Sequence, residues 1–217
     1  MLQFLILPFD PTPWLAYCET ESFSGLWPVL VFCLFCLHFY LMSEYRKTSP
    51  DDLYYLTLNV EGWVDIFSRQ QYKDIIVENL KYCQEKEGLE IYAYVIMTNH
   101  LHLVARRKDK DLTELLGRFK SHTAKKIIEL IKGPVAESRR EWMLYLFEYF
   151  AKKNKQYSNY HFWHYSNHPT QLFTPEVVKQ KTDYIHNNPV RAGIVLEPYH
   201  YLYSSACADS PLKVLEY

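Results

Sequence analysis

The chain has 217 residues, of which 48% are hydrophobic, 17% aromatic and 23% charged. This balance is typical of a globular protein with a sizeable core, and it excludes a disordered, collagen-like or coiled-coil chain. The 24 basic and 25 acidic residues give a net charge of −1, which carries no overall indication of a nucleic-acid partner.

The first 41 residues differ from the rest of the chain. They contain no Lys or Arg, whereas residues 42–217 hold all 24 basic residues and 22 acidic ones (25 − 3). Residues 26–42 are nearly all apolar, but they reach only the lower length limit for a membrane helix, and no basic leader of a secretory signal precedes them. We interpret 1–41 as an apolar extension that comes from a mis-assigned translation start; a membrane anchor or a packed N-terminal element stays open.

Residues 42–217 are predicted to form a single catalytic domain. Their cysteines, Cys83 and Cys207, are a widely spaced pair and do not make a disulfide framework. We therefore expect reduced thiols and a cytoplasmic location, with no membrane partner.

Hydrophobic periodicity predicts the elements in chain order. The first half indicates a strand over 53–59, an amphipathic helix over 70–86, and two strands over 89–97 and 100–106 that pair as a hairpin. The second half indicates helices over 112–131 and 137–152 and a strand over 160–165. A last helix begins at Thr174, which is an N-cap followed by Pro175, and is expected to stop at Pro189. This order predicts an α+β, ferredoxin-like split βαβ sandwich, an antiparallel sheet with helices, plus one C-terminal helix.

A His-x-His pattern lies in the strand predicted over 100–106. Side chains alternate along a strand, so His100 and His102 share one face while Leu101 points to the other. Two imidazoles on one face can take adjacent positions around a metal ion. The pattern alone is weak, because nine histidines in the chain will often produce such a pair as ordinary surface or packed residues.

Two separated blocks carry a resemblance to a known family. The sequence YVIMTNHLHLVARR, around His100 and His102, resembles the His-hydrophobe-His motif of the single-tyrosine HUH transposases. The later block KTDYIHNNPVRAGIV, residues 181–195, resembles the tyrosine helix of that family. The resemblance spans about residues 45–207 and is greatest to the REP-associated tyrosine transposases.

The resemblance implies a function and a set of site residues. His100 and His102 would bind a divalent metal, Mg²⁺ or Mn²⁺, with Asn188 as a third ligand, and Tyr184 would be the nucleophile. The chain would cleave and rejoin single-stranded DNA, in hairpin-forming repeats, through a covalent 5′-phosphotyrosine. A homodimer is possible for such a protein.

The spacing supports this assignment independently. Tyr184 and Asn188 are four residues apart, so one helical face presents both a phenol and an amide oxygen. Asn187 is a rival to Asn188 but points about 100° away on an ideal helix. Other tyrosines without a carbonyl-bearing partner four residues on are rivals to Tyr184: Tyr157, Tyr160 and Tyr165.

Basic residues outside these motifs are candidates for DNA contact, since Lys and Arg neutralise backbone phosphates. They are Arg106, Arg107, Lys125, Lys126 and Arg191. Each could instead belong to an ordinary solvated face. A DNA-hairpin-binding protein that has lost cleavage is the alternative function, and the presence of all four predicted active-site residues favours an enzyme.

Overall fold

The computed structural model describes residues 48–133, 137–154, 159–167 and 169–217. All of them belong to a compact unit that spans Arg46–Tyr217. The extension predicted over 1–41 lies outside the described residues. Among the helices of the described ranges, none is long and apolar enough to cross a membrane.

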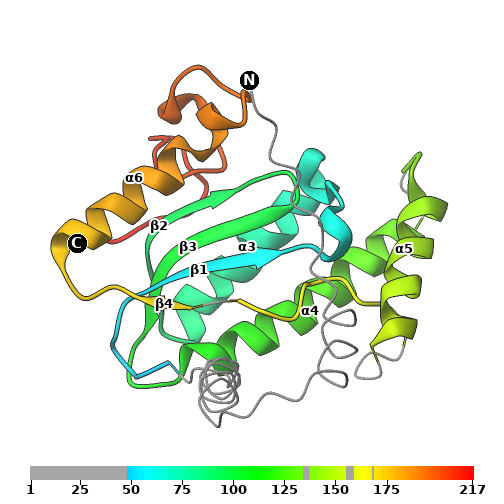
Figure 1. Ribbon diagram of the computed structural model, residues 1–217, viewed down its shortest axis with the longest axis horizontal. Helices are drawn as coiled ribbons and strands as arrows, with labels where there is room; N and C mark the ends of the chain where they lie inside the picture. The colour runs from blue at the N-terminus through cyan, green and yellow to red at the C-terminus, as the bar shows by residue number, and fades with distance from the viewer. Residues whose placement is uncertain (1–47, 134–136, 155–158, 168) are drawn as a thin grey trace, which may run out of the picture. The chain divides into compact units, whose positions relative to one another are not determined.

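A four-stranded antiparallel sheet forms the centre of the described unit. Its strands stand in the spatial order β2-β3-β1-β4, and every neighbouring pair is antiparallel (Figure 1). The strands are β1 (Tyr54–Asn59), β2 (Leu89–Ile96), β3 (His100–Arg107) and β4 (Thr170–Gln171). This order, with helices between the strands, confirms the predicted split βαβ arrangement.

Helices cover both faces of the sheet. Figure 1 shows α3 and α4 on one face and α6 on the other, beside β2 and β3. The four long helices are α3 (Gln70–Lys86), α4 (Leu112–Lys132), α5 (Arg140–Lys153) and α6 (Pro175–Arg191). Three short 3₁₀ turns complete the described elements: η1 (Glu61–Trp63), η2 (Ile66–Ser68) and η3 (Pro198–His200).

The two faces of the sheet differ in polarity because side chains alternate along each strand. In β1, Leu56 and Leu58 are fully buried, while Tyr55, Thr57 and Asn59 lie half-buried on the opposite face. In β3, Leu101 and Leu103 are fully buried. The apolar face packs on α3 and α4, and burying each such leucine contributes about 1.5–3 kcal/mol. The other face is left with polar side chains at its centre.

The end of α6 differs from the prediction. The helix continues past Pro189 to Arg191, because a proline near the end of a helix removes only one backbone hydrogen bond. Gly193 follows the C-cap residue Ala192, and its φ of +69° is a conformation that suits glycine. The Ile194 N–H donates to the Pro189 carbonyl at 2.9 Å, and the Gly193 N–H donates to the Val190 carbonyl at 2.9 Å. This pair of bonds is a Schellman motif, so glycine and not proline is the stop signal.

The strand predicted over 160–165 is also wrong. Only Trp163 makes a bridge to the sheet, to Val60, and the edge strand is β4 instead. His161, Phe162 and Trp163 are all buried, which does not match the alternation of an edge strand. The backbone hydrogen bonds of this segment go to three places. The His161 N–H donates to the Phe147 carbonyl of α5 at 3.0 Å, the Phe162 carbonyl accepts from the Glu61 N–H at 2.8 Å, and the His164 N–H donates to the Asn59 carbonyl at the end of β1 at 2.8 Å.

The C-terminal segment runs along the free edge of β2. The Ile96 N–H donates to the Tyr203 carbonyl at 2.9 Å, and the Leu215 N–H donates to the Ile91 carbonyl at 2.8 Å. Covering an edge strand in this way blocks pairing with other chains. The same segment gives α6 a second surface to pack against.

Candidate active site

The histidine pair lies on the polar face of the sheet. The ring centroids of His100 and His102 are 4.7 Å apart, as expected for alternate residues of one strand, and Leu101 points into the core. His102 is buried and His100 is half-buried. The predicted pairing of two imidazoles on one face is therefore present.

Hydrogen bonding selects the tautomer of His100. Its Nδ1 lies 2.7 Å from the Asn99 Oδ1. The Asn99 amide is oriented by its Nδ2, which donates to the Trp63 carbonyl at 3.4 Å, so the oxygen faces the imidazole. An amide oxygen only accepts, so Nδ1 carries the hydrogen and Nε2 keeps its lone pair. Metal-ligating histidines commonly have this arrangement.

His102 is held by two hydroxyls from β1. Its Nδ1 is 2.9 Å from both the Tyr55 hydroxyl and the Thr57 Oγ1, and the Tyr55 ring stacks on the imidazole with centroids 5.4 Å apart. Burial, with a smaller effect of the neighbouring His100, lowers the pKa of His102 to about 3. Burial also lowers the pKa of His100. Both rings are thus neutral at neutral pH, which is the form that binds metals.

Tyr184 of α6 reaches the same place from the other side. Its ring centroid is 5.6 Å from that of His102 and 6.2 Å from that of Tyr55, both edge-on. The side chain is 39% exposed, so the phenol borders solvent. Two motifs that are far apart in the sequence therefore meet at one site.

Packing of α6 sets the position of this tyrosine. Ile185 and Pro189 are buried, and they anchor one stripe of the helix. The His186 Nε2 lies 2.8 Å from the Ser205 Oγ, and that serine also accepts from the Tyr94 N–H of β2 at 3.0 Å. His186 thus links α6 to the sheet through the C-terminal segment.

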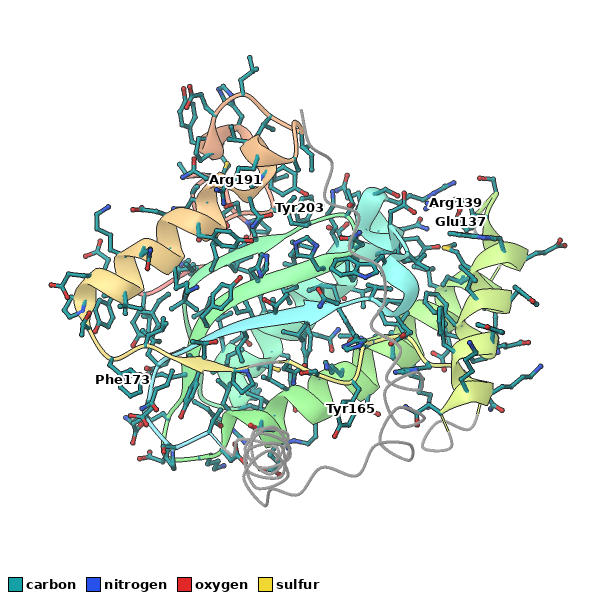
Figure 2. All side chains as sticks on the ribbon, in the orientation of Figure 1. Glu137, Arg139, Tyr165, Phe173, Arg191 and Tyr203 are labelled. Atoms are coloured by element: carbon teal, nitrogen blue, oxygen red, sulfur yellow. The ribbon has the colours of Figure 1, made fainter. Side chains whose placement is uncertain are left out.

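Two cations of α6 flank Tyr184. The Lys181 Nζ is 4.8 Å from the centroid of the Tyr55 ring, and its charge helps lower the pKa of His102. The Arg191 guanidinium is 5.5 Å from the centroid of the Tyr184 ring, and Figure 2 shows Arg191 toward the C-terminal end of α6. Of the five basic residues predicted to contact DNA, Arg191 is the one that the structure brings to this site.

Amide side chains are the remaining candidate ligands. Asn188 is half-buried and lies one helical turn beyond Tyr184 on α6. The Asn187 Nδ2 instead donates to the Asp183 carbonyl at 2.8 Å. Asn59, the cross-strand partner of His100, buries an Oδ1 that has no hydrogen-bond partner among the described residues.

These donors fit a divalent cation. The His100 Nε2 has a free lone pair, His102 is neutral, and the Asn59 oxygen lacks a partner. Imidazole and amide ligands leave positions for phosphate oxygens and water. Across the described residues, no group of three or more His, Cys, Asp or Glu side chains gathers to hold a metal.

The rival tyrosines lie elsewhere or cannot be placed. Tyr160 donates its hydroxyl to Glu148 at 3.0 Å. Tyr165 belongs to the segment before β4, away from α6, where Figure 2 labels it. Tyr157 lies outside the described residues. Among the described tyrosines of the prediction, Tyr184 is the one in contact with the histidine pair.

Arg106 and Arg107 are engaged in ion pairs. Arg107 is 2% exposed, and its guanidinium contacts Glu87 at 2.9 Å and Glu114 at 3.3 Å. Arg106 pairs with Glu90, its cross-strand neighbour on β2. The Arg107 side chain therefore joins the sheet to α4 and is not presented to solvent, which argues against its predicted contact with DNA.

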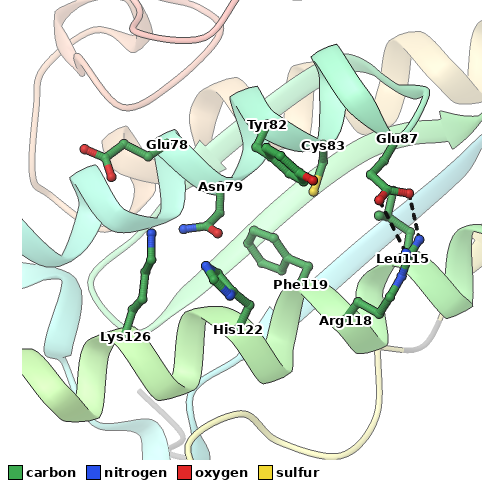
Figure 3. A pocket seen from close by; sticks show the side chains of 10 residues that line it. All are labelled: Glu78, Asn79, Tyr82, Cys83, Glu87, Leu115, Arg118, Phe119, His122 and Lys126. Atoms are coloured by element: carbon green, nitrogen blue, oxygen red, sulfur yellow. Dashed lines mark hydrogen bonds and ion pairs between the residues drawn. The ribbon is translucent and has the colours of Figure 1, made fainter.

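Lys125 and Lys126 are exposed on α4, across the sheet from the histidine pair. Lys126 lines a groove of about 600 Å³ between α3 and α4, which Figure 3 shows from close by. This groove also holds acids and an ion pair between Glu87 and Arg118 at 2.7 Å. Its mixed charge differs from the cationic surroundings of Tyr184.

Several residues of the site were not predicted from the sequence. Tyr55 and Thr57 contact His102 because Thr57 pairs with it across the β1–β3 ladder. Alternation within β1 could have placed Tyr55 and Thr57 on one face. The pairing register between β1 and β3 could not be predicted from the sequence. Lys181 stands three residues before Tyr184, a helical spacing that was a readable signal.

No family model matches this sequence, and the curated proteins contain no match either. Solved structures do show similarity. One is a REP-associated tyrosine transposase bound to a REP hairpin, at 17% identity, covering 76% of this chain and 82% of that one with a TM-score of 0.52. Another is a protein assigned as a transposase in Deinococcus radiodurans, at 15% identity, covering 67% and 93% with a TM-score of 0.37. The chain therefore has the fold of a REP-associated tyrosine transposase.

Proposed function

We propose that this chain is a single-tyrosine HUH transposase of the REP-associated type, which cleaves and joins single-stranded DNA through a covalent 5′-phosphotyrosine. The observation that supports this best is the meeting of Tyr184 with His102 at 5.6 Å, beside a second imidazole at 4.7 Å. A nucleophile and a pair of metal ligands are the parts that this reaction needs.

Each residue has a proposed role. His100 and His102 hold Mg²⁺ or Mn²⁺, with Asn188 as an oxygen ligand from α6. When bound, the divalent cation polarises the scissile phosphate and offsets its developing charge. Tyr55, Thr57 and Asn99 fix the orientation of the two imidazoles.

The cleavage step forms one bond and breaks another. The Tyr184 oxygen attacks phosphorus as its phenolic proton is lost, and the bond from phosphorus to the 3′-oxygen breaks. The 3′-oxygen takes up a proton, leaving a free 3′-hydroxyl and a 5′-phosphotyrosyl bond. Attack by a 3′-hydroxyl on that bond reverses the step and joins strands, so no ATP is needed.

The cations of α6 and the similar structure indicate the substrate class. Lys181 and Arg191 flank the phenol, where they would contact the phosphates beside the scissile bond. The similar transposase is bound to a REP hairpin, which supports a hairpin-forming single strand as the substrate. A homodimer and a cytoplasmic location stay predictions.

Incubation with labelled DNA hairpins and Mn²⁺ tests the proposal. We expect a covalent protein–DNA adduct from the natural chain and none from Tyr184→Phe, which keeps the ring but lacks the nucleophile. Hairpin binding should be nearly unchanged in this variant. Tyr165→Phe, a matched control at an exposed tyrosine away from the histidines, should form the adduct normally. Binding without any adduct from the natural chain would favour the non-catalytic alternative.

A further inference from the structure

Trp63 has an unusual backbone conformation. Its φ is +56°, and the other described non-glycine residues with positive φ are Asp51 and Asp109. Aspartate tolerates the left-handed region, but for a bulky side chain this conformation is a real outlier with an energetic cost. Something other than local preference must therefore hold Trp63 in place.

The loop around Trp63 supplies that restraint. The Trp63 N–H donates to the Val60 carbonyl at 3.1 Å, and the Trp63 carbonyl accepts from Asn99. The preceding Gly62 also has a positive φ, and a Cβ there would meet the Phe150 ring of α5 at 2.5 Å. Glycine thus lets the loop pack closely on α5 and turn Trp63 outward.

The strained conformation is not used to fill the core. The Trp63 side chain is 65% exposed, so most of the indole contacts water and gains little from burial. Its ring stands edge-on to His100 with centroids 6.3 Å apart. The fold therefore holds an exposed aromatic surface beside the histidine pair, and the same Asn99 amide contacts both the loop and His100.

We propose that Trp63 is a nucleobase-stacking subsite that holds a base of the single strand next to the scissile phosphate. Exposed aromatic rings beside cations are the common means of binding single-stranded DNA, because every base offers a π-face and every phosphate a charge. Here Trp63 lies on the His100 side of the site, and Lys181 and Arg191 lie on α6. This inference rests on the proposed function and adds the contact that fixes one base.

The test compares variants of Trp63 in the Tyr184→Phe background, where binding is measured without cleavage. Fluorescence anisotropy with a single strand spanning the cleavage site and Mn²⁺ should show about 10-fold weaker binding for Trp63→Ala and little loss for Trp63→Phe. Trp142→Ala is the matched control, since Trp142 is an exposed tryptophan on α5, and it should bind normally.

Two further measurements separate stacking from a structural role. An abasic site at the DNA position that contacts Trp63 should weaken binding by the protein that has Trp63. It should not weaken binding by Trp63→Ala further, so removing the base and removing the indole are not additive. Trp63→Gly should bind DNA as weakly as Trp63→Ala. Its melting temperature should be the same as that of Trp63→Ala or higher, because glycine adopts the positive φ without steric cost.

Equal binding by Trp63→Ala and the natural side chain would overturn the inference. So would a loss that persists, undiminished, with abasic sites at every position near the cleaved bond. Failure of the proposed function is a different result: the natural chain would then form no covalent adduct with any hairpin. If the natural chain binds no single strand at all, both are contradicted.

Discussion

The two halves of the candidate site are built differently. The sheet half holds His100 and His102 on β3, and a hydrogen bond engages the Nδ1 of each imidazole. The helix half holds Tyr184 on α6, whose side chain is 39% exposed and contacts the imidazole of His102 edge-on. The first half is fixed by the strand ladder, whereas the second depends on the packing of one helix.

The two halves of the candidate site suit different steps of the proposed reaction. In the proposed function, metal binding needs ligands that are held in place before the ion arrives, and the sheet would supply His100 and His102. A tyrosine that becomes joined to DNA needs access and some freedom to move, and a helix anchored by Ile185, Pro189 and His186 allows both. Changes at the two histidines should therefore alter metal binding most, and a change at Tyr184 should alter the covalent step and leave metal binding intact.

The largest effect is expected from the histidines. His100→Ala or His102→Ala should lower metal-dependent cleavage by about 100-fold or more, because each would remove one of the proposed metal ligands. Mn²⁺ binding, measured by electron paramagnetic resonance, should fall in both, while Tyr184→Phe binds the ion normally. His122→Ala, at an exposed histidine on α4, is the control. Full cleavage by the double variant with a chelator present would contradict the assignment.

Acid should destabilise the metal-free protein. The pKa of His102 is about 3 when folded, against an ordinary 6.5, so below 6.5 the unfolded chain binds the proton and the folded one does not. The free energy of unfolding should thus fall by about 2 kcal/mol from this residue between about pH 7 and pH 5. Urea titrations check this: His102→Gln should lose that part of the dependence, and His122→Gln should keep it.

Lys181 offers a contrast within one helix. Lys181→Ala should lower the cleavage rate about 10-fold, because it removes a charge over the Tyr55 ring that, in the proposed function, would contact a phosphate beside Tyr184. Lys179 is two residues away, is exposed and pairs with Asp183 at 2.7 Å, so Lys179→Ala should change the rate less than about 2-fold. Single-turnover cleavage with both variants measures the difference. Equal rates for the two would show that α6 presents no special charge at the site.

The smallest effect is expected from the extension over 1–41. A chain that begins at Met42 retains Thr48, whose Oγ1 accepts from the Leu112 N–H at 2.9 Å and from the Thr113 N–H at 3.2 Å at the start of α4. It should therefore express and cleave like the full chain. Insolubility, or loss of cleavage in the same assay, would show that the extension is a working part of the protein.

Local signals in the sequence predicted much of the fold. The apolar spacing over 70–86 gave the bounds of α3, and Thr174 with Pro175 gave the start of α6. The errors arose where tertiary contacts determine the structure. The segment over 160–165 makes backbone hydrogen bonds to α5, to the turn after β1 and to the last residue of β1, and no local pattern reveals this.

The candidate site was readable only in part. Strand alternation placed His100 and His102 on one face, but the hydroxyls that hold His102 depend on the β1–β3 register. Arg107 looked like a surface cation in the sequence, yet it is buried against Glu87 because strand and helix meet there. The turn that exposes Trp63 depends on the contact of Gly62 with Phe150 of α5, and these two residues are far apart in the sequence.

We propose that the sheet histidines and the helix tyrosine form one active site. Peptide mass spectrometry of the adduct formed with a DNA hairpin and Mn²⁺ tests it most directly. We predict that the nucleotide is attached to the peptide containing Tyr184, through a bond to the 5′-phosphate, and that the adduct disappears in His100→Ala/His102→Ala. Attachment to another tyrosine, or an adduct that forms equally well without the histidines, would contradict the account.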